Sequence, residues 1–492
     1  MQVIALLLSV TATTGISAQM PIKLTVINPV APDTADVRLY ATPHPWRAAA
    51  TVGGLNMTIW AFDRFVQHGD FAYISLKTMK ENFKHGFKWD NDKMGTNMFL
   101  HPYHGNLYFN GARSNGMNYW RSGLFAIGGS AMWELFMENE YPSTNDIIAT
   151  PIGGMAIGEV LYRISDTMID DRLHGWARFG REAGVFALSP MRGLTRIING
   201  DAWRIRRTPG QQFGTPSVGL EVSAGARIIT FRHKAINDTR PAMALEINME
   251  YGDRFEVKST APYDYFNIRA AFNLLNRQPF LSQLNIKGRL LARELQDDSL
   301  RHLSIGLYQH FDYYDSDTTS TLMAKCPYKL GVPASVGGGL LYRRVMPRKW
   351  VFDGYLHANA ILLGAILSDF YRVDERNYNL AAGYSTKIGA HCVFGRDKLS
   401  IGVSSEFYRL FTWKGYPRGT TLGEADYRTL NVMGDKSTAS FGVTELMIQM
   451  RVWRKLYFSM GVSHYFRATH YHFYPNVRSG SLSERMMVTW KI

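Results

Sequence analysis

The side chains that could do chemistry are concentrated in one stretch of this 492-residue chain, between about residues 97 and 159. The candidate catalytic residues are His101, His104, Ser114, Glu134, Asp146 and Glu159, and Arg113 precedes Ser114. Glu134 and Glu159 are flanked by apolar and small residues, which indicates that both are buried. Because a buried carboxylate needs a compensating partner, each should meet an arginine, a histidine, a metal or a substrate.

Three interpretations of this set are open. A histidine–carboxylate pair beside Ser114 could activate its hydroxyl for acyl transfer. Two histidines with two or three carboxylates could instead bind a divalent metal. The third interpretation is a buried polar network that only fixes helices, and Ser143 with Asp146 already fits the capping box that begins a helix. The sequence has no Walker loop, dinucleotide fingerprint, HExxH motif or zinc pair, so no cofactor is expected.

The elements that carry these residues are predicted to be helices, because a period of two is absent between Gln19 and about Gly200. Gly, Pro and Asn residues break this region into segments. The expected helices are Trp46–Val66, Tyr73–His85, His104–Asn115, Asn118–Glu140 and Asn145–Asp170. The last two are rich in small residues, and the spacing of Gly154 and Gly158 predicts that they pack closely against each other.

From about Ser217 onward, apolar and polar residues alternate strictly, as Val218, Leu220 and Val222 do with their neighbours. About twelve such segments occur, and many are longer than strands of soluble sandwiches. They lie near 217–228, 242–251, 264–275, 281–295, 301–313, 333–346, 350–368, 376–389, 399–413, 437–453, 456–469 and 481–492. An even number of long, two-faced strands predicts a mainly β fold, an antiparallel transmembrane β-barrel of about 12 strands preceded by an α-helical plug or periplasmic domain.

The connections between these strands differ in length. Long ones are expected after the first, fifth, ninth and eleventh strands, for example at Asp315–Gly331 and Lys414–Asp435, and tight ones after the fourth, sixth and tenth. Long extracellular loops that alternate with short periplasmic turns give this pattern. We therefore expect the long loops at the cell surface and both ends of the barrel in the periplasm.

The start of the chain indicates export. Val3–Val10 is an apolar core followed by small residues before Gln19, as in a secretory signal. The predicted organisation is a signal peptide at 1–18, a helical domain at 19–200 and an outer-membrane β-barrel at 201–492. The expected location is the bacterial outer membrane, with outer-membrane lipids and lipopolysaccharide as partners. Nucleic acid is not expected, because Lys and Arg alternate along the strands instead of clustering.

Charge predicts how the two parts interact. Residues 122–171 hold eight acids and one base, whereas 197–492 hold 38 basic and 25 acidic residues. Basic residues expected on the polar face of the barrel are Lys287, Arg289, Arg293, Arg451 and Arg467. Opposite charges attract in a confined, poorly hydrated space, so the acidic helix pair is predicted to dock in or against the lumen as a plug. The alternative is an acidic periplasmic domain without lumen contact.

Six short motifs follow one another in the helical part: HPYHG at 101–105, ARSNG at 112–116, GSxxWE at 129–134, PSxND at 142–146, TPxGG at 150–154 and GE at 158–159. In this order they resemble an uncharacterised family of Bacteroidota outer-membrane proteins that carries a domain of unknown function. The resemblance covers roughly residues 86–165. It implies a location and a fold, and no activity.

The leading hypothesis is an integral outer-membrane β-barrel with a helical plug that passes, gates or scaffolds an anionic solute or lipid. The alternative is an outer-membrane enzyme that hydrolyses lipid or lipopolysaccharide with the His/carboxylate/Ser group. A third hypothesis is a structural or assembly role with neither pore nor catalysis. Convergence of His101, His104, Glu134 and Asp146 on a solvent-reachable cavity at a lipid-facing gap would favour the enzyme, and burial in a helix seam would favour a scaffold.

Overall fold

A computed structural model describes Asp36, Tyr40–Asp90 and Asp92–Ile492, except for residues 234–235, 258–260, 275–277, 317–326, 348–349, 371–376 and 421–430. The predicted signal peptide and parts of both long loops lie outside these residues. Contacts divide the chain into two compact units, Met1–Lys84 with Tyr103–Glu140 and Ile157–Pro216, and His85–Pro102 with Tyr141–Ala156 and Ser217–Ile492. The predicted boundary at 200 separates 85–102 and 141–156 from the barrel, whereas the contacts group them with it.

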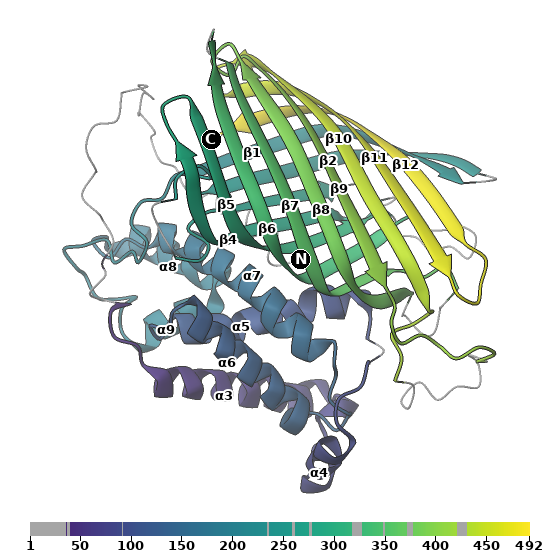
Figure 1. The fold of residues 1–492 in the computed structure, drawn as a ribbon. Coiled ribbons are helices and arrows are strands. Elements are labelled where there is room, and N and C mark those ends of the chain that lie inside the picture. Colours follow the sequence, from purple (N-terminus) through teal and green to yellow (C-terminus); the bar gives the residue numbers. More distant parts are fainter. Residues whose placement is uncertain are drawn as a thin grey trace. The chain divides into compact units, whose positions relative to one another are not determined.

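In the second unit, twelve antiparallel strands close into a barrel among the described residues (Figure 1). Each strand pairs with its neighbours in sequence, and the first pairs with the last. The strands are β1 (Val218–His233), β2 (Ile236–Tyr251), β3 (Phe266–Asn273), β4 (Leu281–Asp297), β5 (Arg301–Asp315), β6 (Lys329–Met346), β7 (Trp350–Leu367), β8 (Tyr378–Phe394), β9 (Leu399–Phe411), β10 (Ser437–Trp453), β11 (Leu456–Tyr471) and β12 (Val477–Lys491). The predicted fold class is confirmed.

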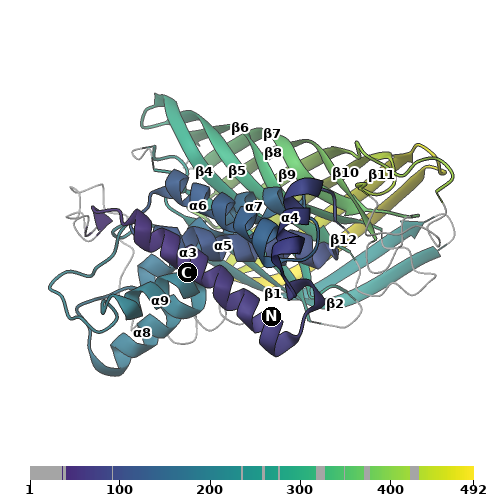
Figure 2. The same cartoon turned by 90° about the horizontal axis from the view of Figure 1, so that it is seen from below.

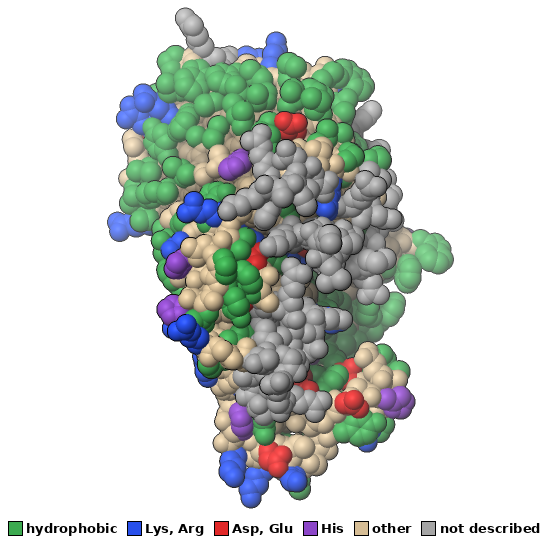
Figure 3. Space-filling model, turned by 90° about the vertical axis from the view of Figure 1, so that its right-hand side faces the viewer, with side chains coloured by type: hydrophobic (Ala, Val, Ile, Leu, Met, Phe, Trp, Pro, Cys, Tyr) green, Lys and Arg blue, Asp and Glu red, His purple; other side chains and the backbone are tan. Residues whose placement is uncertain are grey.

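The alternation in sequence becomes an alternation between the outside and the lumen. On β12, Met486, Val488 and Trp490 are exposed, and Met487 and Thr489 between them are buried. Apolar side chains cover the barrel strands at the top of the view in Figure 3. An apolar outer surface around a polar interior is the arrangement that a lipid bilayer requires of a β-barrel.

The predicted alternation of long and short connections is only partly correct. β1 ends at His233 and β2 begins at Ile236, so the long connection expected after the first strand is wrong. Pro241 lies within β2 and opposite Ile228. The connection after the eleventh strand is also short, because β12 already begins at Val477. At these two connections the strands stay paired beyond the region where apolar and polar side chains alternate. The sequence pattern could not predict this, because it depends only on the side chains.

The helices are close to those expected from the sequence. They are α3 (Pro45–Phe62), α4 (Leu76–His85), α5 (His101–Arg113), α6 (Tyr119–Met132), α7 (Asp146–Met168), α8 (Gly175–Leu188) and α9 (Pro190–Ile198). The last two lie beyond the expected set. In the first unit, α3 packs along α6 and α8 along α9 (Figure 2). Among the described helices, α7 alone is long and apolar enough to cross a membrane, and 72% of that stretch is buried.

The small residues of α6 and α7 pack against α5, and the prediction that they face each other is wrong. A Cβ atom at Gly158 would lie 2.8 Å from Phe109 Cδ1, and one at Gly129 would lie 2.7 Å from Tyr108 Cγ. Both aromatic residues belong to α5. The sequence correctly indicated that these glycines lie at close contacts, but the rings of Tyr108 and Phe109 fill the contacts instead of a second helix backbone.

The segments 85–102 and 141–156 pack against the outer wall of the barrel. Met98 and Ala149 belong to a buried apolar cluster with strand residues such as Tyr313. Tyr313 lies between Asp312 and Tyr314, and these two face the lumen. The strand residues of the cluster are Tyr313, Ala334, Leu363, Ala365, Tyr378 and Leu380. These two segments therefore cover the ends of β5–β8 from outside.

Gly331 on β6 tests this packing. A Cβ atom there would lie 2.5 Å from Met98 Sδ, whereas one at the outward-facing Gly338 meets nothing within 4 Å. We expect Gly331→Val to displace the segment around Met98 at a cost of about 1–3 kcal/mol, because the side chain overfills a packed contact. Hydrogen exchange should then rise in 85–102. Gly338→Val is the control, and equal exchange in the two variants would contradict the packing.

Candidate functional site

His101, Asp92 and Asp146 converge in the second unit. His101 is the first residue of α5, which continues directly from the π-helical turn Thr96–Leu100, and Asp146 is the first residue of α7. His101 Nε2 lies 3.2 Å from Asp92 Oδ2 and 3.3 Å from Asp146 Oδ1. The Asp146 side chain is 6% exposed, that of His101 18% and that of Asp92 49%. The group is therefore anchored in the interior and reaches solvent through Asp92.

A second layer of polar residues holds these carboxylates. Asp90 Oδ2 accepts hydrogen bonds from Ser143 Oγ at 2.6 Å and from Asn145 Nδ2 at 2.8 Å. Asn145 Nδ2 also lies 3.0 Å from Asp146 Oδ1. Ser143 Oγ accepts the Asp146 backbone N–H at 3.2 Å, as a helix cap does. The capping interpretation explains Ser143, and the same serine also orients Asp90.

The carboxyls of Asp90 and Asp146 interact directly. Burial raises the pKa of Asp146 well above its usual range, and the charge of Asp90 and the hydrogen bond between the two carboxyls add to the rise. Burial alone would also raise the pKa of Asp90. Hydrogen bonds from Asp146 and Ser143 and the charge of His101 outweigh it, so the pKa of Asp90 is lowered. When the pair holds a single proton, it therefore resides on Asp146.

A barrel residue supports the same group. Tyr378 on β8 accepts a hydrogen bond from Asn97 Nδ2 at 2.6 Å and donates its own to the Asp92 carbonyl. Asn97 Oδ1 in turn accepts Asn145 Nδ2 at 2.8 Å. Asp90, Asp92, Asn97 and Tyr378 were not among the predicted site residues. Of these four, only Asp92 could have been found from the sequence, because it is an acidic residue nine positions before His101.

Glu159 belongs to a different, fully buried network in the first unit. Arg113 binds its carboxylate with two parallel hydrogen bonds of 2.7 and 2.8 Å, and Arg163 Nε adds a third at 2.9 Å. The Glu159 side chain is 0% exposed. A carboxylate enclosed by two guanidinium groups serves to hold helices together, so the structural interpretation fits this residue.

The other predicted residues do not form a hydrolase triad in the described part of the chain. Ser114 Oγ has no hydrogen-bond partner there, and thus no general base. The His104 ring lies against Tyr108 and Trp133, with centroids 4.6 and 5.2 Å apart. Glu134 is buried, and its backbone carbonyl lies 3.4 Å from Asn82 Nδ2. Of the predicted site residues in the second unit, the structure brings His101 and Asp146 together.

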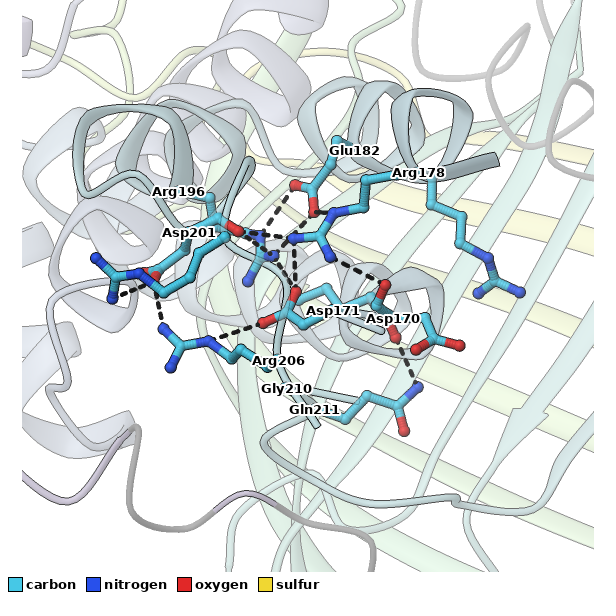
Figure 4. A network of polar contacts seen from close by, with 12 residues as sticks. Asp170, Asp171, Arg178, Glu182, Arg196, Asp201, Arg206, Gly210 and Gln211 are labelled. Carbon is cyan, nitrogen blue, oxygen red and sulfur yellow. Dashed lines mark hydrogen bonds and ion pairs between the residues drawn. The ribbon is translucent and has the colours of Figure 1, made fainter. Parts of the chain in front are cut away.

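The acidic residues near the end of α7 are neutralised within their own unit. Asp171 pairs with Arg178, Arg196 and Arg206, and Glu182 bridges the first two of these arginines (Figure 4). These arginines lie beyond residues 122–171, the stretch whose eight acids and one base predicted an acidic helix pair. The acids at the end of the predicted helix pair are therefore already compensated within the helical unit, and docking as a plug stays a prediction.

The barrel lumen contains a cavity of about 730 Å³. Its lining comes largely from the end where β1 begins and β12 ends, and includes residues such as Glu221 and Lys491. Most charges on its wall are paired. The pairs are Arg254–Glu250, Arg269–Glu445, Arg269–Glu246, Arg343–Asp353, Lys387–Asp312, Lys387–Glu406, Lys491–Glu221 and Lys491–Asp397. Of the five basic residues predicted on the polar face, Lys287 alone is among those that line the described cavity, where acids outnumber lysines and arginines.

Three nitrogen-bearing side chains of this wall lack such compensation in the described residues. Lys287 makes no described ion pair, and its Nζ lies 4.9 Å from the centre of the Tyr355 ring. His310 and His357 are 1% and 0% exposed, and neither ring nitrogen of either has a hydrogen-bond partner. Lys287 pairs with His310 across β4 and β5, and the two histidine rings are 5.2 Å apart. The three therefore form one group on the cavity wall.

An apolar layer fills the interior beyond the cavity, toward the opposite end. Phe441 and Tyr465 are at its centre, with ring contacts to Tyr314 and Tyr328. Its members are Tyr314, Tyr328, Leu330, Val332, Ile361, Ile366, Ala381, Tyr408, Leu410, Ala439, Phe441, Val443 and Tyr465. Within the described residues, the lumen is thus a pocket with a packed floor.

The fold and site define a transmembrane β-barrel with a helical unit. Residues 86–191 match a family described as Domain of unknown function (DUF3943). This match confirms the predicted resemblance to a family that carries a domain of unknown function, and the taxon stays a prediction. The matched residues include all six motifs and exclude the barrel. Among curated proteins, none matches the sequence significantly.

Several solved structures are weakly similar. The Pseudomonas putida toluene transporter TodX is 8% identical, with coverage of 57% of this chain and 90% of that chain and a TM-score of 0.23. The transport unit of the Escherichia coli autotransporter AIDA-I is 10% identical, with coverage of 56% of this chain and 90% of that chain and a TM-score of 0.28. An anion-selective porin from Comamonas acidovorans is 8% identical, with coverage of 56% of this chain and 100% of that chain and a TM-score of 0.21. TM-scores this low carry no argument about function.

Replacement of Glu159 by Gln tests its structural role. The change keeps the shape but leaves Arg113 and Arg163 buried without a counter-charge, so we expect a loss of about 3–5 kcal/mol in the free energy of unfolding of the helical unit. Chemical denaturation followed by helical circular dichroism measures it. Glu140→Gln, at an exposed position, is the matched control. An unchanged stability of the Glu159 variant would point to a role other than structural.

Proposed function

We propose that this protein is an integral barrel of a bacterial outer membrane that takes up a small solute with an anionic group into its lumen. The observation that carries the proposal is the group of Lys287, His310 and His357 on the wall of the 730 Å³ cavity. A buried polar group without a partner is costly, and a ligand that supplies the partner removes that cost.

The charges on the cavity wall favour one selective anion site over a general attraction of anions into the lumen. Acids outnumber lysines and arginines along the lining, and nearly all are held in pairs such as Lys387–Asp312 at 2.6 Å. A paired wall attracts neither sign of charge strongly. Lys287, with two histidines beside it, is then the point at which an anionic group gains most.

The apolar layer supports a gated passage or a binding pocket. Phe441 and its aromatic neighbours fill the interior beyond the cavity. A solute that enters from the end of the barrel termini meets this layer and stops there. Passage through the barrel requires the layer to move, which is the gating that we propose. Outer-membrane lipids and lipopolysaccharide are proposed as the surroundings of the apolar outer wall.

The lipid hydrolase is the weaker candidate. It needs a base at Ser114, and among the described residues the Ser114 hydroxyl has no hydrogen-bond partner. The group around His101 does combine an imidazole with carboxylates, but its own serine, Ser143, is engaged with Asp90 at 2.6 Å.

Lys287→Met tests the anion site. The variant keeps the aliphatic stem and removes the ammonium, so the affinity for inorganic phosphate, as a probe, should fall by about tenfold or more, because a hydrogen bond to a charged group contributes about 1.5–3 kcal/mol. Calorimetry on the detergent-solubilised barrel measures it. The control is Lys398→Met, in the exposed turn after β8. Equal affinities in the two variants would exclude the site.

Phe441→Ala tests the gate. Removal of a central ring from the apolar layer should raise single-channel conductance in planar bilayers severalfold, because it opens the packed floor of the pocket. Phe407→Ala is the matched control, since Phe407 lies on the neighbouring strand and alternates with the lumen-facing Glu406 and Tyr408. Heat-modifiable gel mobility reports that both barrels are folded. A conductance equal to that of the control would rule out the layer as the barrier.

A further inference from the structure

The group around His101 has a chemistry that neither the lumen cavity nor the proposed transport uses. Asp92, His101 and Asp146 each offer one ligand atom, and these atoms all lie within 4.8 Å of one another. The three residues come from three separate places, which are the connection before α5, the first residue of α5 and the first residue of α7. They are a mixed nitrogen and oxygen set, and this distinguishes them from a surface cluster of acids.

The distances between ligand atoms match those around a tetrahedral metal. Zinc binds histidine nitrogen at about 2.0–2.1 Å and carboxylate oxygen at about 2.0–2.2 Å, and the edge of such a tetrahedron is about 3.3 Å. His101 Nε2 lies 3.2 Å from Asp92 Oδ2 and 3.3 Å from Asp146 Oδ1. A single ion therefore reaches the histidine and either carboxylate without a shift of the helices. The half-exposed Asp92 closes the third edge by rotating its side chain.

The surrounding hydrogen bonds are those that orient ligands at metal sites. Asn145 Nδ2 donates to the Asp146 carboxylate at 3.0 Å. Tyr378 of the barrel donates to the Asp92 carbonyl and so fixes the connection that carries this carboxylate. Such second-layer partners hold ligands in the orientation that a metal needs. The site is thus supported both by its helices and by the barrel wall.

The local charge also favours a cation. Asp90 lies beside Asp146, because Asn145 Nδ2 donates to both side chains, at 2.8 Å to Asp90 Oδ2 and at 3.0 Å to Asp146 Oδ1. Asp92 adds a third carboxylate, with a ligand atom within 4.8 Å of that of Asp146. A divalent ion would compensate the negative charge of these carboxylates.

We propose that Asp92, His101 and Asp146 form a binding site for a divalent transition metal of the Zn²⁺ type. The imidazole ligand selects against Ca²⁺ and Mg²⁺, which prefer all-oxygen sites. Three protein ligands leave a coordination position for water, and the exposure of Asp92 opens that position to solvent. The metal would join the starts of α5 and α7 at the barrel wall.

The chain contains a second cluster that serves as an internal control. Glu294, Asp297 and His302, around the turn between β4 and β5, also lie within 4.8 Å of one another. Glu294 and Asp297 are exposed, and the Glu294 carboxylate already accepts the Val257 N–H at 3.2 Å. We expect no tight metal binding there, because flexible exposed carboxylates bring no preformed geometry.

The experiment uses the full chain in detergent, purified without a polyhistidine tag and treated with a chelator. Titration with Zn²⁺ should show one tight site per chain. Co²⁺ should give the visible absorption of a tetrahedral site with nitrogen ligation. His101→Gln and Asp92→Asn should each abolish the tight site and the Co²⁺ spectrum. Asn145→Ala should weaken Zn²⁺ binding by about ten- to hundredfold, as loss of a second-layer partner does.

His302→Gln is the matched control and should bind Zn²⁺ like the native chain. Asp92 is half exposed, so its variant should fold even if that of His101 does not, and heat-modifiable mobility checks both. Three results would overturn the proposal: no Zn²⁺ binding by the native chain, unchanged binding by folded Asp92→Asn, or loss of binding in His302→Gln. Tight Ca²⁺ binding without Zn²⁺ binding would overturn the assignment to a transition metal.

Discussion

Backbone hydrogen bonding inside a membrane is the constraint on which this structure depends. A bilayer offers no partner to an unpaired N–H or C=O, so a sheet that crosses it must close on itself. The pairing of β1 with β12, from Glu221 opposite Lys491 to Arg232 opposite Gly480, provides that closure. Closure then assigns every second side chain to the lumen, and polar lumen residues have to satisfy one another there.

The chain meets this requirement, and the similar one in its helical unit, mainly by local charge pairing. Asp312 lies with Lys387 in the lumen, and Glu159 lies between Arg113 and Arg163 among the helices. Such pairs are costly to break and contribute little attraction to distant parts. The groups outside this pattern are therefore informative: Lys287 with its two histidines in the lumen, and the carboxylates around His101.

The barrel also acts as a support for the motif-rich segments. Its outer wall, through residues such as Leu363 and Leu380, buries the apolar side of 85–102 and 141–156. Tyr378 adds hydrogen bonds to the first of these segments, with Asn97 and Asp92. The hydroxyl of Tyr378, at the start of β8, thus helps to hold the site that contains Asp92, His101 and Asp146. This arrangement explains why the segment with the PSxND and TPxGG motifs, and the chain up to Pro102, group with the barrel.

The sequence by itself determined the strands, because the inside–outside alternation is local: Ser437–Trp453 was predicted to the residue, and Leu456–Tyr471 to within two. It also identified His101, Asp146 and Glu159 as residues that need partners. Only the tertiary structure decided which partners they have. Asp92 joins His101, Arg113 encloses Glu159, and Ser114 has no hydrogen-bond partner among the described residues. The physical reason is that ion pairs and hydrogen bonds depend on distances across the fold, and neither composition nor periodicity contains those distances.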